Sequence, residues 1–192
     1  MSADLNTFLP DPDIRKRHSV LVHAPAEIVF QIARGFDMTS VPLIRTIFQM
    51  RAQLLGARAG ATSTTLTSED LLRLGWATLA EQPGRLFIAG AACQPWLADV
   101  VFTPVPPERF RAYAEPDRVK IAWTLEAEPL GHDRSRLATE TRAAGTDAEA
   151  RRRFRRYWRI FGIGIICIRW LLLPAIRREA ERRWRATSPR PS

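Results

Sequence analysis

Residues 119–128 read Val-Lys-Ile-Ala-Trp-Thr-Leu-Glu-Ala-Glu, and this stretch decides the fold. Its apolar side chains recur at every second position: Val119, Ile121, Trp123, Leu125 and Ala127. Its polar side chains fall between them: Lys120, Thr124, Glu126 and Glu128. Successive side chains of a strand point to opposite faces, so this strand has one apolar and one polar face. Such alternation is typical of an antiparallel sheet with one covered and one solvated face.

Neighbouring stretches carry the same signal. Alternating or short apolar runs bounded by turn residues predict further strands, at 17–23, 76–80, 85–91, 96–102, 109–113 and 137–143. The turn sequence Glu81-Gln-Pro-Gly84 joins two of them into a hairpin. On the polar face, cross-strand ion pairs are expected among Lys120, Glu126, Glu140 and Arg142.

Three helices are predicted around these strands. Ala-Pro-Ala-Glu at 24–27 opens the first helix, and Gly35 ends it. Helical spacing of apolar residues predicts the second helix at 41–55. Its candidates for burial are Leu43, Ile44, Ile47, Phe48, Leu54 and Leu55. The third helix covers 147–184, with Thr146 as its expected N-cap.

The order of these elements predicts the fold class. A strand, two helices, a run of strands and one long helix indicate an α+β domain, since strands and helices are segregated along the chain. The long C-terminal helix is the only element large enough to cover the sheet. We therefore expect a curved antiparallel sheet wrapped around that helix in one domain at 14–184. An N-terminal extension at 1–13 and a flexible tail at 185–192 flank the domain.

Several stretches resemble a known superfamily. Residues 18–30, His-Ser-Val-Leu-Val-His-Ala-Pro-Ala-Glu-Ile-Val-Phe, are similar to the first strand and first helix of the SRPBCC superfamily, which includes START domains and polyketide cyclases. Residues 115–123, 139–142 and 154–158 resemble an uncharacterised bacterial branch of it. The resemblance covers about 14–184. It implies a helix-grip fold and an internal cavity for a hydrophobic or amphipathic molecule, lipid-like or polyketide-like.

The expected function is therefore binding or carrying such a ligand. Side chains on the apolar face of the sheet and on the facing side of the long helix are the candidates for the cavity wall: Trp76, Trp96, Ile121, Trp123, Leu125, Thr139, Thr141, Phe154, Trp158, Phe161 and Ile165. The resemblance carries over no catalytic residue. A cyclase- or dehydratase-type enzyme stays open as the alternative, and it needs two titratable groups that face the cavity. The sequence offers His18 for that role.

Other chemistry lacks a motif. The three histidines, His18, His23 and His132, are not spaced as metal ligands, so no metal site is expected. The sequence has no Gly-x-Ser-x-Gly motif, which would indicate a serine nucleophile. It also lacks a dinucleotide-binding Gly-x-Gly-x-x-Gly motif after a strand, and no cofactor is expected. Cys93 and Cys167 stand alone, which favours a reducing compartment. The N-terminus lacks the apolar stretch of a secretory signal, so the expected location is cytoplasmic.

The long helix carries the charge of the protein. Residues 151–185 contain 12 arginines and 2 glutamates, whereas the preceding 150 residues are nearly neutral. The neighbouring aromatic residues lie on the covered side, so they are not free to stack on bases and no nucleic acid is expected. Between Ile160 and Leu173 the helix is apolar nearly all round, broken only by Arg169.

Three explanations of this apolar stretch stay open. The preceding helices cover it, or a second copy of the chain covers it in a homodimer, or it contacts a membrane surface. In the last case the arginines opposite the apolar stripe meet anionic head groups, and the protein is membrane-associated: Arg152, Arg153, Arg155 and Arg156.

Overall fold

The structure is a computed structural model that describes residues 4–56 and 66–187. In chain order its elements are α1 (Leu5–Phe8), β1 (Ile14–Val22), α2 (Ala26–Gly35), η1 (Met38–Ser40), α3 (Pro42–Leu55), α4 (Ser68–Arg73), β2 (Ala77–Gln82), β3 (Leu86–Cys93), β4 (Thr103–Pro104), α5 (Pro107–Phe110), β5 (Val119–Pro129), β6 (Ser135–Gly145) and α6 (Ala148–Thr187).

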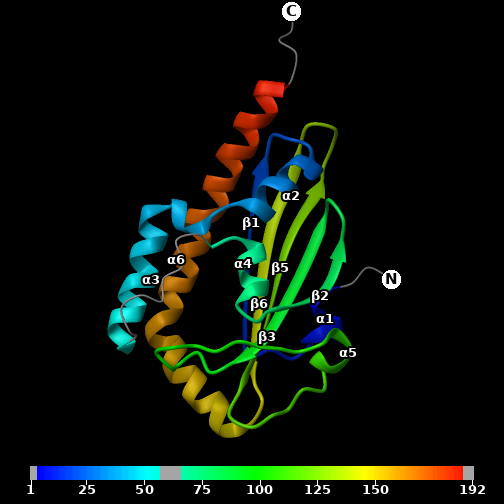
Figure 1. The fold of residues 1–192 in the computed structure, drawn as a ribbon. Helices are drawn as coiled ribbons and strands as arrows, with labels where there is room; N and C mark the ends of the chain where they lie inside the picture. Colours follow the sequence, from blue (N-terminus) through cyan, green and yellow to red (C-terminus); the bar gives the residue numbers. More distant parts are fainter. Residues whose placement is uncertain (1–3, 57–65, 188–192) are drawn as a thin grey trace, which may run out of the picture.

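The strands form an antiparallel sheet in the order β1-β6-β5-β3-β2, with β4 paired to the end of β3. The register places Trp123 of β5 opposite Thr141 of β6, and His18 of β1 opposite Thr139 of β6. Figure 1 shows α6 running along one face of this sheet, with α3 on the far side of α6. The predicted α+β class and the long C-terminal helix over an antiparallel sheet are confirmed.

The face of the sheet toward α6 is covered at its two ends. At one end, Val29 and Phe30 of α2 pack with Leu173 and Ile176 of α6 in one apolar cluster. At the other end, the N-terminal half of α6 contributes Phe154 and Tyr157 to a second cluster, and Val119 of β5 lies there. α6 therefore contacts the sheet near both of its ends, and we call this face the inner face.

The outer face of the sheet is covered as well, against the expectation that it is solvated. α1 and α5 pack on it through Phe8 and Phe110, whose rings meet edge to face with centroids 6.5 Å apart. Ala122 of β5 is fully buried beneath them. The polar residues expected in solvent here include three buried ones: Lys120, Glu140 and Arg142. This unexpected cover comes from α1, which precedes β1, and from α5, which precedes β5.

The buried polar residues of the outer face are paired. The Nε of Arg142 donates to Glu140 over 2.7 Å, and its Nη1 donates to the Asn6 amide oxygen and the Leu9 carbonyl. The Nζ of Lys120 donates to the carbonyl of Arg111 over 2.8 Å. Burial lowers the pKa of Lys120. The four residues expected to pair across strands form no cross-strand ion pair with one another in the described ranges, because Arg142 and Glu140 both lie on β6. Glu140 instead forms its cross-strand ion pair with Arg15 of β1, at 2.8 Å.

Two predicted strands are wrong. Residues 96–102 form a turn, a bend and irregular chain, and residues 109–113 contain the end of α5 and a turn. Only Thr103–Pro104 between them forms a short strand, β4, and the following Pro106 and Pro107 have no N–H to donate to a ladder. Phe102 instead packs against Trp76, with ring centroids 5.4 Å apart. The apolar residues of this loop therefore give the same sequence pattern as a short strand.

Details of the helices also differ from the expectation. Leu43 and Leu54 of α3 are exposed, whereas Ile44 is fully buried as expected. α6 is capped by Asp147, whose Oδ1 accepts from the Ala150 N–H at 2.7 Å. Thr146, the expected cap, instead exchanges hydrogen bonds with the backbone of Arg118.

Candidate functional site

The middle of the inner face is incompletely covered. Ile121 and Trp123 lie on β5, which has a strand on either side, yet both side chains are only half-buried. Ile165 and Ile168 on the neighbouring length of α6 are also half-buried. By contrast, Ala122 on the outer face is fully buried. α6 thus packs tightly near the two ends of the sheet and leaves apolar surface accessible between them.

The predicted cavity residues divide between the two inner clusters. Trp76, Trp123 and Leu125 belong to the cluster beneath α2, where Trp123 meets Phe87 edge to face at 6.0 Å. The other cluster contains five of the predicted residues: Trp96, Ile121, Phe154, Trp158 and Phe161. The two threonines, Thr139 and Thr141, lie on β6 between them. Leu125, Thr139 and Phe154 are almost completely buried.

An open hollow of about 450 Å³ lies where α6 meets α3 and the segment after β3. Two predicted residues, Trp96 and Phe161, line it, and Leu55, Tyr157 and Ile160 complete its apolar wall. The sequence prediction missed these last three. Arg153 and Arg156 stand at the same hollow. Its volume falls in the range of small-molecule sites.

The sequence did not predict one polar side chain of the inner face, that of Arg169, as a site residue. Arg169 of α6 is 8% exposed, and its Nη2 donates a hydrogen bond to the Thr141 hydroxyl. Burial lowers the pKa of Arg169 to about 10. Arg169 lies one helical turn after Ile165 and one turn before Leu173, which is on the covered side. This helical spacing is the feature of the sequence that could have placed Arg169 on the covered side of α6.

His18 of β1 lies on the same face and is half-buried. Its Nδ1 atom is buried without a hydrogen-bond partner in the part of the chain that the structure describes. Its ring meets Trp170 of α6 edge to face, with centroids 6.4 Å apart. Burial lowers the pKa of His18, and the positive charges of Arg169 and Lys16 lower it further.

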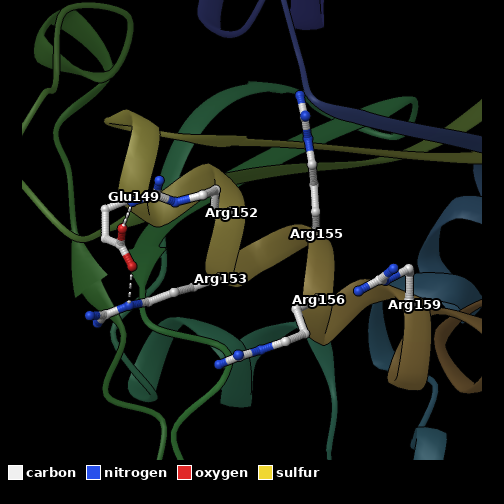
Figure 2. Close-up of a pocket in the computed structure, with 6 residues that line it drawn as sticks. All are labelled: Glu149, Arg152, Arg153, Arg155, Arg156 and Arg159. Atoms are coloured by element: carbon white, nitrogen blue, oxygen red, sulfur yellow. Dashed lines mark hydrogen bonds and ion pairs between the residues drawn. The ribbon is translucent and has the colours of Figure 1, made fainter.

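The outward side of α6 forms an open groove of about 640 Å³ (Figure 2). It is lined by Glu149 and five arginines: Arg152, Arg153, Arg155, Arg156 and Arg159. Glu149 accepts from Arg153 over 3.0 Å and also pairs with Arg152. Arg155 pairs with Asp13 at 3.6 Å. Within residues 4–56 and 66–187, Arg156 and Arg159 form no ion pair.

Beside this groove, α6 exposes large apolar side chains. Ile160, Ile163 and Trp170 are 65%, 71% and 65% exposed. α3 covers part of the helix, because Ile47 approaches Gly164 so closely that an added Cβ would lie 3.2 Å from the Ile47 Cγ2. Among the described residues, α6 is the one helix long and apolar enough to cross a membrane, by length and composition alone.

No cluster of three or more His, Cys, Asp or Glu side chains suited to a metal ion occurs in the described ranges. Cys93 is buried and Cys167 is half-buried, and both are free thiols. Burial raises the pKa of Cys93 to about 12, so its thiol stays protonated at neutral pH. The inner face therefore offers apolar surface with an arginine, a histidine and two threonines.

The chain is thus an α+β protein in which a long helix covers the inner face of an antiparallel sheet. No family profile matches its sequence. No curated protein matches it either. The likeness to solved structures is one of chain course: a Thermobifida fusca protein solved by NMR is 14% identical, with 88% of this chain and 93% of that chain covered and a TM-score of 0.40.

Aromatase/cyclase proteins are among these structural neighbours. The Zhui aromatase/cyclase from Streptomyces sp. R1128 is 18% identical over 91% of this chain and 98% of that chain, with a TM-score of 0.30. The di-domain ARO/CYC BexL is 14% identical over 88% of this chain and 46% of that chain, with a TM-score of 0.29. Likeness at this level identifies no family and no activity.

Proposed function

We propose that the protein binds or carries a hydrophobic or amphipathic small molecule between the inner face of the sheet and α6. The observation that carries this proposal is the half-buried state of Ile121 and Trp123 in the middle of the sheet. Apolar side chains at the centre of a sheet are normally covered, and covering them releases water from their surface. A ligand that fills this space gains that free energy.

The hollow beside Trp96 and Phe161 supports the same proposal. It adjoins the cluster that contains Ile121, so it is a candidate entrance to the inner face. Ring stacking of Tyr157 on Phe161, with centroids 4.9 Å apart, gives that entrance a rigid apolar wall.

Two experiments test the proposal. Native mass spectrometry of protein purified from its own host should detect a co-purified apolar molecule. In parallel, an uncharged dye such as Nile red should bind and fluoresce. Ile121→Gln should weaken dye binding, whereas Ile163→Gln on the exposed side of α6 should not. Absence of both a bound mass and dye binding, or equal loss in the two variants, would contradict the proposal.

A second candidate is an enzyme of the cyclase or dehydratase type acting on such a ligand. The observation that favours it is that two titratable side chains, His18 and Arg169, lie near each other on the inner face. The positive charge of Arg169 is close enough to lower the pKa of His18. An unpaired imidazole nitrogen suits proton transfer. His18→Gln should then abolish turnover of a linear poly-β-ketone mimic and leave its binding unchanged.

We also propose reversible contact with an anionic membrane. Ile160, Ile163 and Trp170 form an exposed apolar stripe. Arg156 and Arg159, which form no ion pair with any described residue, stand at its N-terminal end. Apolar and cationic side chains side by side match the chemistry of an acidic bilayer surface. A carrier of lipid-like cargo would exchange it there.

A further inference from the structure

Arg169 is a buried cation without a counter-ion in the part of the chain that the structure describes. The residue is 8% exposed, its Nη2 donates to Thr141, and its Nη1 is buried without a partner among the described residues. No carboxylate of residues 4–56 or 66–187 forms an ion pair with it. The remaining segments, 1–3, 57–65 and 188–192, contain no aspartate or glutamate. Removing a charge from water without a partner is costly, so this arrangement requires an explanation.

The same chain shows how a structural buried arginine is satisfied. Arg142, on the outer face, is 3% exposed, and it donates to Glu140, to Asn6 and to the Leu9 carbonyl. Its charge is balanced and its donors are used. Arg169 on the inner face has one neutral acceptor and a free donor. The difference indicates that the partner of Arg169 comes from outside the chain.

The neighbours of Arg169 fit an anion. Lys16 and His18 come from β1 on the same face, and in the sheet they lie opposite Thr141 and Thr139 of β6. Both charged residues, Arg169 and Lys16, act on the His18 ring. The polar side chains that these observations place near Arg169 are therefore cationic or neutral. The Thr141 hydroxyl accepts from Arg169 and keeps its own proton to donate.

We infer that this Arg169 site binds an oxygen-acid group, a carboxylate or a phosphate, at one end of an amphipathic ligand. The inference rests on the proposed ligand-binding function and adds the class of its ligand. The apolar part of the ligand lies against Trp123, which is opposite Thr141 in the register, and against Ile165, one turn before Arg169. An anion there receives charge-assisted hydrogen bonds in a low-dielectric environment.

Three probes with one dodecyl chain test this: dodecanoate, dodecyl phosphate and dodecanol, each titrated below its aggregation limit by calorimetry. The wild-type protein should bind at least one anion about tenfold more tightly than the alcohol, as expected for one charge-assisted hydrogen bond. Arg169→Met should abolish that preference and should still bind dodecanol. Arg178→Met, on the exposed side of α6, should keep the preference. Whichever of dodecanoate and dodecyl phosphate binds more tightly identifies the acid group of the ligand as a carboxylate or a phosphate.

The outcomes against the inference are distinct. Equal binding of all three probes by the wild type, or an unchanged preference in Arg169→Met, overturns the anion site and leaves ligand binding intact. Binding of none of them overturns ligand binding itself. Arg169→Met should unfold at a higher temperature than the ligand-free wild type, because methionine has no charge to desolvate. If that variant does not fold, Thr141→Val, which removes the hydroxyl, must reduce the preference.

Discussion

The Nε of Arg51 donates a hydrogen bond of 3.1 Å to the Tyr157 hydroxyl and so ties α3 to α6. The Nη2 of the same side chain donates to the carbonyls of Pro95 and Leu97, at 3.0 and 3.3 Å. One arginine therefore holds together the two helices and the segment that border the hollow beside Trp96. The shape of that hollow depends on a few polar contacts at its rim.

Arg51→Met should loosen this rim. The variant loses three hydrogen bonds, and we expect a loss of about 1–3 kcal/mol in the free energy of unfolding. Limited proteolysis should then cut residues 95–102 faster. Gln49→Met, on the exposed side of α3, is the control and should leave the cleavage rate unchanged. Equal protection of this segment in Arg51→Met and wild type would contradict the assigned role.

Glu140→Gln should be strongly destabilising. It leaves Arg142, a residue that is 3% exposed, without its carboxylate partner, and breaking such a buried pair costs roughly 3 kcal/mol or more. Glu126→Gln is the matched control, because Glu126 pairs with Arg17 at 3.9 Å near the surface. That change should cost less than about 1 kcal/mol. Urea unfolding measures both, and similar midpoints for the two variants would refute the difference.

His18 should make stability depend on pH between neutral and mildly acidic conditions. Burial, followed by the charges of Arg169 and Lys16, lowers its pKa from the ordinary value of 6.5. The unfolded chain therefore takes up this proton at a higher pH than the folded chain. Stability should fall as the pH drops through 6.5, and this loss is complete below the folded-state pKa.

Urea midpoints of wild type and His18→Gln across this range measure the effect. The variant lacks the imidazole, so the difference in unfolding free energy between the two proteins should change with pH in the stated direction. Parallel pH profiles would show that His18 makes no such contribution. Carboxylates with lowered pKa values, such as Glu181, act in a separate window below 4.5, so they do not obscure this one.

Vesicle binding should depend on where the arginines lie and not only on their number. Replacing Arg156 and Arg159 with glutamine should lower binding to phosphatidylglycerol vesicles roughly tenfold or more at low salt, at about 1 kcal/mol per arginine. The control with the same change in net charge replaces Arg182 and Arg183, which pair with Glu179 at the far end of α6. Sedimentation with vesicles measures both.

Two results would count against membrane contact. One is equal loss in the two double variants, which would reflect net charge alone. The other is an absence of binding together with a dimer in analytical ultracentrifugation that Ile163→Asp converts to a monomer. In that case a second copy of the chain covers the exposed stripe of Ile160, Ile163 and Trp170.

The predictable part of the fold was its periodic part. The alternation from Val119 to Glu128 and the helical spacing after Asp147 are local patterns, and both elements form as predicted. The covered outer face was not predictable in this way. Arg142 is buried because Asn6 and Leu9, far away in the sequence, close over it. Nothing in the pattern of β6 itself distinguishes that arginine from a solvated one.

The residues of the candidate site likewise fall into those that a local sequence pattern predicts and those that only the folded arrangement brings together. Trp123, Thr139 and Thr141 followed from the strand pattern, and the structure places them on the inner face beside α6. Spacing alone would put Arg169 on the covered side of α6. Its lack of a carboxylate partner, however, is a property of the folded arrangement. Leu55 and Tyr157 joined the hollow beside Trp96 only because α3 folds back onto α6.

Strand β1 forms one open edge of the sheet, and it carries Arg15, Lys16 and Arg17 in succession. An unpaired edge offers its backbone N–H and C=O groups to any other extended strand. Edge-to-edge addition of a second molecule would bring these positive charges together, and charged edge residues are a common protection against such polymerisation. The basic edge of β1 thus opposes amyloid-like stacking at this end of the sheet.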